Sequence, residues 1–193
     1  MVNFRFDERK ALAAILYISG KLIERNQVSK EAKPDMHRIS KILYFADRKH
    51  LVRYGRPILG DHFVAMKDGP VPSKTYDLMK AIKGESPFCN AENFKASFEV
   101  KGFIVHPKQA ADMDEFSESD IECINESLQE NQDLTFGQLR DKSHDWAYNK
   151  ASENNRISFI AMTKAEGIDE DMISYIETVA ENQHLLSRTV SFH

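Results

Sequence analysis

Two rigid bends around a short apolar strand pattern limit, more than any other feature, the folds that this chain can adopt. Residues 35–52 carry apolar side chains around much of a helical circumference, which predicts a helix buried on two sides. Gly55 follows where a helix end commonly needs positive φ, and Pro57 prevents the helix from continuing. Residues 68–70 read Asp-Gly-Pro, a second turn signal. Fixed bends of this kind usually serve a scaffold.

The remaining patterns predict further helices and a hairpin around this segment. Apolar residues at helical spacing predict helices over 7–26 and 73–83, and a strand is expected within 60–66. Capping-box patterns predict helices that begin at Ser117 and at Thr135, and the last predicted helix begins at Asp169. The helix from Thr135 is expected to carry Leu139, Trp146 and Ala147. Alternating apolar residues predict a hairpin over 94–107 with its turn at residues 101–102.

These patterns together favour the α+β class. We expect a predominantly helical single domain of about six helices with a small antiparallel sheet or hairpin. The domain is expected to span residues 1–186, followed by a flexible C-terminal tail at 187–193. A chain of 193 residues suits one domain and is long enough to bury a full core without disulfides.

Composition and charge narrow the partners and the compartment. The formal net charge of −4 argues softly against nucleic acid as a partner, because such binding needs a basic surface. The first ten residues are charged where a signal peptide would be apolar, and the apolar stretch 11–18 is too short to span a membrane. Cys89 and Cys123 form no CxxC and are expected to be reduced. We therefore expect a cytoplasmic protein that does not enter membranes.

Motifs that would indicate catalysis or a cofactor do not occur in the sequence. The seven histidines are scattered, without HExxH and without a cysteine at zinc spacing. The sequence contains no GxGxxG, no GxxxxGK[ST] and no GxSxG. Cys123 lies within a predicted amphipathic helix and is interpreted as core. The sequence thus predicts no catalytic residue, no cofactor and no metal ligand, and we expect that the protein is not an enzyme.

One block of sequence resembles a known family. Residues 41–50 read K-I-L-Y-F-A-D-R-K-H, 54–58 read Y-G-R-P-I, 60–61 read G-D, 63–66 read F-V-A-M and 68–71 read D-G-P-V. This order resembles the Panacea domains, also called SocA-like or GepA-like phage-associated domains. Ser143, His144 and Trp146 look like the downstream signature of the same family. The resemblance covers residues 11–151. It departs from the family pattern at residues 66–68, where Met, Lys and Asp replace the residues common before the Gly-Pro turn.

The resemblance implies an antitoxin. Panacea domains occur with unrelated toxins, many of which block translation, and they neutralise these toxins by direct protein–protein contact. The implied partner is therefore a cognate toxin protein. One SocA-like relative instead acts as a proteolytic adaptor that delivers its toxin to ClpXP, so ClpX is a possible second partner. A DNA-binding regulator that uses the 94–107 hairpin as a winged-helix wing is a further alternative.

Several residues are candidates for motif or partner-binding roles: Tyr44, Asp47, Arg48, Tyr54, Asp61, Gly69, Pro70, His144 and Trp146. The charged residues among them at the end of the second helix form either a rim that steers a partner or a solvated helix end, and we favour the latter. The two tyrosines are either interface anchors or half-buried core, and we favour core. Asp61 is expected to bond backbone amides at a turn, and His144 to be a hydrogen-bonded structural residue.

Overall fold

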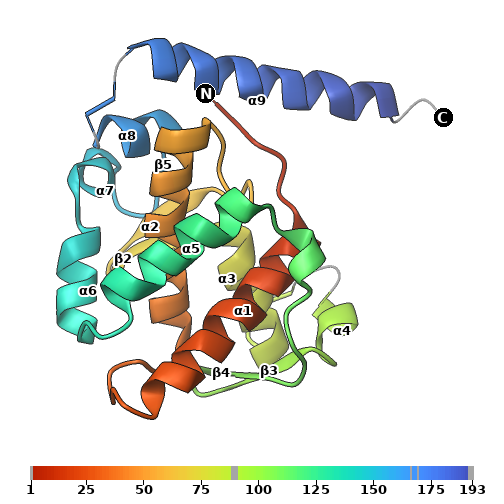
Figure 1. The fold of residues 1–193 in the computed structure, drawn as a ribbon, viewed down its shortest axis with the longest axis vertical. Coiled ribbons are helices and arrows are strands. Elements are labelled where there is room, and N and C mark those ends of the chain that lie inside the picture. Colours follow the sequence, from red (N-terminus) through yellow and green to blue (C-terminus); the bar gives the residue numbers. More distant parts are fainter. Residues whose placement is uncertain (1, 88–90, 166, 169, 191–193) are drawn as a thin grey trace.

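The central helix α2 organises the molecule. The computed structural model describes residues 2–87, 91–165, 167–168 and 170–190. Helix α2 (Met36–Tyr54) is capped by Asp35 at its start and by Gly55 at φ 69° at its end, and 14 of its 19 residues are buried. It contacts α1 (Glu8–Asn26) and α5 (Glu118–Asn131), which cover it in Figure 1. The predicted helix, its buried faces and its glycine end are confirmed.

A three-stranded sheet lies against α2. Strands β1 (Phe63–Met66), β2 (Gly69–Pro72) and β5 (Arg156–Ile157) pair antiparallel in the order β2-β1-β5, with Phe63 opposite Pro72 and Ile157. The sequence predicted β1 but read the start of β2 as a turn. Pro70 and Pro72 are two positions apart, so their ring nitrogens point to the same side of the strand, and an edge strand tolerates that.

A second sheet is the predicted hairpin. Strand β3 (Phe98–Lys101) pairs antiparallel with β4 (Ile104–Pro107). Helix α4 (Ala91–Phe94) precedes it, so the strands begin four residues later than predicted, and the turn lies at residues 102–103 instead of 101–102. The hairpin packs against α1 and α3 (Ser73–Lys83), and Ile104 bridges to Asp35. It is therefore part of the body of the domain.

The helices after residue 117 follow their capping signals. Both predicted capping boxes are present, at Ser117 for α5 and at Thr135 for α6 (Phe136–Ser143). The prediction that the helix from Thr135 continues through Trp146 is wrong. Helix α6 ends at Ser143, and Asp145 caps a new helix, α7 (Trp146–Lys150), by accepting a hydrogen bond from the amide of Tyr148. An aspartate side chain that bonds to the backbone in this way competes with a continuous helix.

The chain ends with a long helix that crosses the body. After η1 (Met113–Glu115) and α8 (Phe159–Lys164), helix α9 (Glu170–Val190) lies above the N-terminal segment and extends past the rest of the fold (Figure 1). Its predicted start, Asp169, lies outside the described residues. The helix reaches Val190, inside the predicted tail, and residues 191–193 are also outside the described range, so the flexibility of the tail stays a prediction.

The α+β, predominantly helical class is confirmed. The described residues form nine α-helices instead of about six, because α4, α7 and α8 are short helices that periodicity does not resolve. Cys123 is a buried free thiol, and Cys89 lies outside the described residues. Within the described ranges, no helix has both the length and the apolar character needed to cross a membrane.

Candidate protein-binding surface

The two segments that resemble the family, residues 41–71 and 143–146, are joined by hydrogen bonds at Asp145. The side chain of Tyr44 is fully buried in α2, and its hydroxyl donates a 2.8 Å hydrogen bond to Asp145 Oδ2. The Arg48 guanidinium, one turn further along α2, donates to the same oxygen and lies 5.8 Å from the centre of the Tyr44 ring. Since Asp145 also caps α7, these contacts fix the helix that carries Trp146 to the centre of the fold. Tyr44 is thus fully buried core, deeper than the half-buried core expected.

The favoured interpretation of Asp47 and Arg48 as a solvated helix end is wrong, and the surface rim is excluded as well. Only 1% of Asp47 and 9% of Arg48 are exposed, because the loop after α2 lies against Asp47 and Asp145 pairs with Arg48. Asp47 accepts a 2.7 Å hydrogen bond from the amide of Ile58 and so holds the bend at Pro57. Burial raises the pKa of the Asp47 carboxyl to about 8, so the group is mostly neutral at pH 7.

Asp61 performs the capping that α3 cannot perform for itself. The residue before α3 is Pro72, which offers no capping side chain. Asp61 accepts hydrogen bonds from the Lys74 amide at 3.1 Å and from the Thr75 amide at 2.8 Å, and a third from the Thr75 hydroxyl. The expected bonding of Asp61 to backbone amides is present, and its negative charge lies at the positive end of the helix dipole.

Gly69 and Pro70 lie over a buried lysine. Gly69 has φ 99°, and a Cβ there would lie 2.4 Å from Ser143 Oγ and 2.8 Å from Lys41 Cε, so that only glycine fits. The Lys41 ammonium, with no exposed surface, donates a 2.9 Å hydrogen bond to the Pro70 carbonyl. Burial lowers the pKa of Lys41 to about 7. Sequence analysis assigned no role to Lys41, although the position of a lysine within the broad buried face of α2 was an available signal.

Lys41 and Ser143 resemble in type the base and nucleophile of serine–lysine catalysis. Both side chains are completely buried, so a substrate has no access to either in this conformation. Their positions against Gly69 instead make them part of the contact between α2, β2 and α6. In the part of the chain that the structure describes, no group of three or more His, Cys, Asp or Glu side chains is arranged to hold a metal ion.

Next to this contact lie three exposed and three half-buried side chains, which we together call the aromatic surface: His37, Met66, Phe136, His144, Trp146 and Tyr148. The His37 ring stacks on Phe136 with centroids 4.1 Å apart, and its Nε2 lies 3.2 Å from the Asp68 carbonyl oxygen. The Tyr148 hydroxyl donates to the Met66 carbonyl at 2.8 Å. Met66, Phe136 and Trp146 are 40–49% exposed. The aromatic surface therefore joins α2, the β1–β2 hairpin, α6 and α7.

Two neutral histidines stiffen the aromatic surface. Burial lowers the pKa of His37 to about 4, and burial together with the nearby Arg140 and Lys41 lowers the pKa of His144. The His144 ring stacks on Tyr148 with centroids 4.1 Å apart and planes 7° apart. Its Nε2 is buried without a hydrogen-bond partner, so the hydrogen-bonded role expected for this ring is not seen at that nitrogen.

The predicted site residues fall into separate places. His144 and Trp146 belong to the aromatic surface. Gly69 and Pro70 lie beneath it, against Lys41. Tyr44 and Arg48 bind Asp145, the residue that caps α7. Tyr54 lies at the opposite end of α2, roughly 26 Å away from His37 along the helix axis. It is 36% exposed, and its hydroxyl donates to Glu122, so it is not part of the aromatic surface. Sequence reasoning missed His37, Met66, Phe136 and Tyr148, because only the tertiary fold brings them together.

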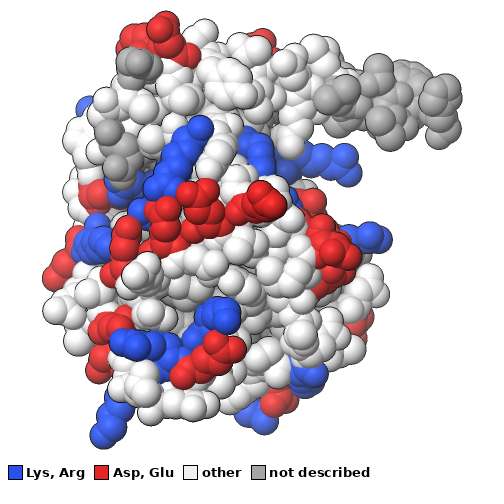
Figure 2. All heavy atoms as spheres, viewed as in Figure 1, with Lys and Arg blue, Asp and Glu red and all other residues white. Residues whose placement is uncertain are grey.

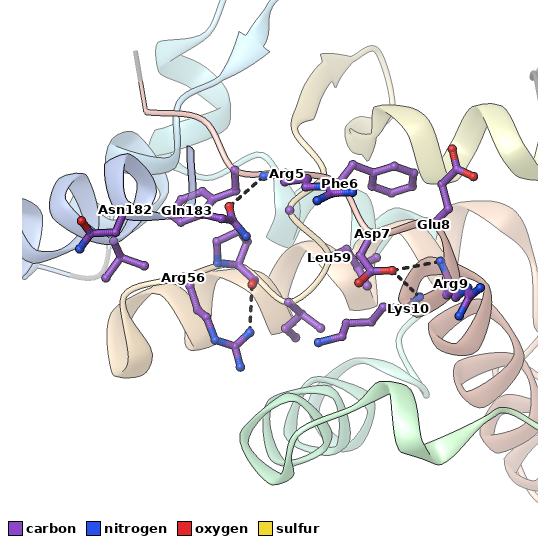
Figure 3. Close-up of a pocket in the computed structure, with 15 residues that line it drawn as sticks. Arg5, Phe6, Asp7, Glu8, Arg9, Lys10, Arg56, Leu59, Asn182 and Gln183 are labelled. Atoms are coloured by element: carbon purple, nitrogen blue, oxygen red, sulfur yellow. Dashed lines mark hydrogen bonds between the residues drawn. The ribbon is translucent and has the colours of Figure 1, made fainter. Parts of the chain in front are cut away.

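The acidic and basic side chains form two distinct surface features. Figure 2 shows a band of acidic side chains along α5, and α2 supplies Lys49 and Arg53 to neutralise it, with the Arg53 guanidinium 2.7 Å from Glu126. The second feature is a groove of about 1020 Å³ between the N-terminal segment, α9 and the loop after α2 (Figure 3). Its charged lining residues are Arg5, Arg9, Lys10 and Arg56 together with Asp7 and Glu8.

These features define an α+β scaffold whose motif residues fix bends and helix junctions beneath an exposed aromatic surface. The chain belongs to the family of SocA-like antitoxins with the Panacea domain, whose family model matches residues 39–149. The matched range contains α2 from Ile39 onwards, both sheets except β5, and the helices from α3 to α7 as far as Asn149. Searches of curated proteins and of solved structures found no match to the chain.

Proposed function

We propose that this protein is an antitoxin that binds a cognate toxin protein through the aromatic surface and neutralises it by direct contact. The observation that carries the proposal is the 40–49% exposure of three large apolar side chains, Met66, Phe136 and Trp146, on elements that are fastened to one another. Aromatic residues and methionine are enriched at the centres of protein interfaces, where a few of them provide most of the binding energy. The family to which the chain belongs is named for antitoxins, and this supports the proposal.

The support beneath these side chains favours tight binding. Trp146 stands on a helix tied to α2 through Asp145, and Phe136 is stacked on His37. Side chains that are already held in place lose little conformational entropy when a partner covers them. Direct neutralisation needs no reactive centre, in keeping with the burial of Lys41 and Ser143. An antitoxin of this kind acts where its toxin acts, which for translation-blocking toxins is the cytoplasm.

Co-expression with the product of the adjacent gene tests the proposal. We expect that product to arrest growth alone, the wild-type protein to restore growth, and the double variant Phe136→Ala, Trp146→Ala to fail to restore it. Phe103→Ala is the matched control, because Phe103 is 66% exposed at the tip of the β3–β4 hairpin, and its ring lies against the Lys83 ammonium, which is not part of the aromatic surface. Persistent arrest in the presence of wild-type protein would refute the antitoxin function.

The adaptor and regulator alternatives predict different results. An adaptor for ClpXP shortens the half-life of the toxin, and deletion of ClpX then abolishes neutralisation. Direct neutralisation leaves that half-life unchanged and works without ClpX. A DNA-binding regulator shifts the mobility of its own promoter DNA at physiological salt. The hairpin that was the expected wing packs against α1 and α3, and its Lys101 ammonium lies 2.6 Å from Glu99, so the regulator has less support.

A further inference from the structure

The groove in Figure 3 has walls of three different origins. The N-terminal segment passes along one side, residues 56–60 form the floor, and Val179, Asn182 and Gln183 of α9 close the other side. The amide of Arg5 donates a 2.9 Å hydrogen bond to Gln183 Oε1, and the amide of Asp7 donates a 3.0 Å bond to the Leu59 carbonyl. Both bonds fasten the N-terminal segment in place.

Gly60 makes this wall close-fitting. It has φ 66°, and a Cβ at this position would lie 2.0 Å from the carbonyl oxygen of Arg5. The N-terminal segment can therefore lie against the floor only because residue 60 is glycine. The groove is thus preformed, and a ligand that enters it need not order its walls.

Four basic side chains, those of Arg5, Arg9, Lys10 and Arg56, and two acidic ones, those of Asp7 and Glu8, line the groove, so basic groups outnumber acidic ones here although the whole protein has a formal net charge of −4. Lys10 and Arg56 approach Asp120 from opposite sides, at 2.9 Å and 3.1 Å, and are partly neutralised by it. Arg5 and Arg9 are exposed, and their guanidinium groups form no ion pair with any described residue. Figure 2 shows basic side chains beneath α9 on this side of the molecule.

The floor of the groove is apolar, with contributions from Phe4, Pro57, Ile58, Leu59 and Val179. A site for nucleic acid mainly contacts phosphate and sugar and does not need an apolar floor. A peptide segment with carboxylates and apolar side chains fits both the floor and the rim. A volume of about 1020 Å³ also exceeds the need of one side chain and suits several residues.

Two of the three walls come from outside the part of the chain that matches the family model, residues 39–149. The aromatic surface, by contrast, comes from residues 37–148 and lies almost entirely within it. The groove is thus an addition to the shared domain, in a position to distinguish one partner from another.

We propose that this groove binds an acidic, extended segment of the toxin and so sets which toxin the protein recognises. This inference rests on the antitoxin function proposed above. Arg5 and Arg9 pair with carboxylates of the segment, and its apolar side chains cover the half-buried Val179. Charge pairs at such a rim raise the association rate and select the partner.

The test compares two charge-reversed variants of the full chain in binding to the purified toxin. Arg5→Glu, Arg9→Glu reverses the rim, and Lys95→Glu, Lys101→Glu makes the same change in charge at exposed sites around the remote hairpin. We expect the rim variant to bind about tenfold or more weakly, with a shallower dependence on salt, and the control to stay within about twofold of wild type. Circular dichroism and unfolding midpoints establish that both variants are folded.

The outcomes separate the two proposals. If the wild type does not bind or neutralise the toxin, the antitoxin function fails. If the wild type binds and the rim variant binds equally well, or no more weakly than the hairpin control, the groove inference alone is refuted. Loss of affinity for duplex DNA in the rim variant, with toxin binding unchanged, also refutes it.

Discussion

The hydroxyl of Tyr44 donates a 2.8 Å hydrogen bond to Asp145, 101 positions later in the chain, and so joins the central helix to the junction of α6 and α7. Tyr44 is buried and Asp145 is half-buried, yet the bond between them fixes the helix that carries the exposed Trp146. The motif that identifies the family therefore acts mainly from inside the molecule, by holding the surface above it in place.

Removal of this hydroxyl should destabilise the fold. Tyr44→Phe keeps the ring and deletes the donor to Asp145, so we expect the free energy of unfolding to fall by about 1–2 kcal/mol, measured by urea denaturation. Tyr54→Phe is the matched control, because the Tyr54 hydroxyl donates to Glu122 at the surface, and its loss should leave stability nearly unchanged. Equal effects of the two substitutions would contradict the importance of the buried bond.

Gly69 allows a comparison between backbone strain and close packing. Gly69→Ala and Gly84→Ala both place a side chain at positive φ, at 99° and 90°. The Cβ at residue 69 also meets Ser143 and Lys41, whereas nothing lies within 4 Å at residue 84. We expect Gly84→Ala to cost about 1 kcal/mol of unfolding free energy and Gly69→Ala about 3 kcal/mol or more. Similar unfolding midpoints for the two variants would show that α6 moves away from β2 at little cost.

Local signals in the sequence predicted local structure well. Each capping box at Ser117 and Thr135 depends on side chains three residues apart, so the sequence contains all the information for it. The charged residues after Ala46 led to the wrong prediction of a solvated helix end. Helical spacing places Asp47 on one face of the helix but does not reveal that other segments cover that face. The His37–Phe136 stack joins residues 99 positions apart, and no spacing rule predicts such a pair.

The pKa of Asp47 implies an unusual pH dependence. In the folded protein it is about 8, above the value of about 3.9 of an unfolded aspartate, so between these values the native state binds a proton that the unfolded state has released. This stabilisation is complete below about pH 4 and is lost as the pH rises towards 8, with a slope of at most about 1.4 kcal/mol per pH unit. The negative charges of Asp61 and Asp120 act in the same direction, and Arg56 opposes it.

Asp47→Asn isolates this contribution. Asparagine retains an acceptor for the Ile58 amide but cannot ionise, so its stability relative to wild type should increase from pH 5 to pH 8. Urea denaturation of both proteins across this range measures the difference. Asp133→Asn, a change at an exposed carboxylate of lowered pKa, should not show this increase. A difference between Asp47→Asn and wild type that stays constant with pH would contradict the raised pKa.

Asp120 provides the opposite case at acidic pH. Its carboxyl group is completely buried, and it receives Lys10 Nζ at 2.9 Å, with His50 Nε2 and Arg56 each 3.1 Å away. Despite burial, the close His50 ring and the hydrogen bond from Lys10 hold the pKa of Asp120 well below its usual range. This stabilisation is present above the unfolded pKa of about 3.9 and is lost as the pH falls towards the lower folded value.

Asp120→Asn should therefore lower the free energy of unfolding at pH 7 by about 3 kcal/mol, since it leaves the charged Lys10 and Arg56 side chains beside a neutral group. The loss should shrink below pH 4, where the wild type begins to lose the same stabilisation. Because Lys10 and Arg56 also line the groove, the substitution should loosen the N-terminal segment. Relative to wild type, amide hydrogen exchange should therefore accelerate more at Asp7 and Arg5 than at Leu43 in the core. Unchanged exchange at both amides would mean that the groove keeps its shape without the Asp120 charge.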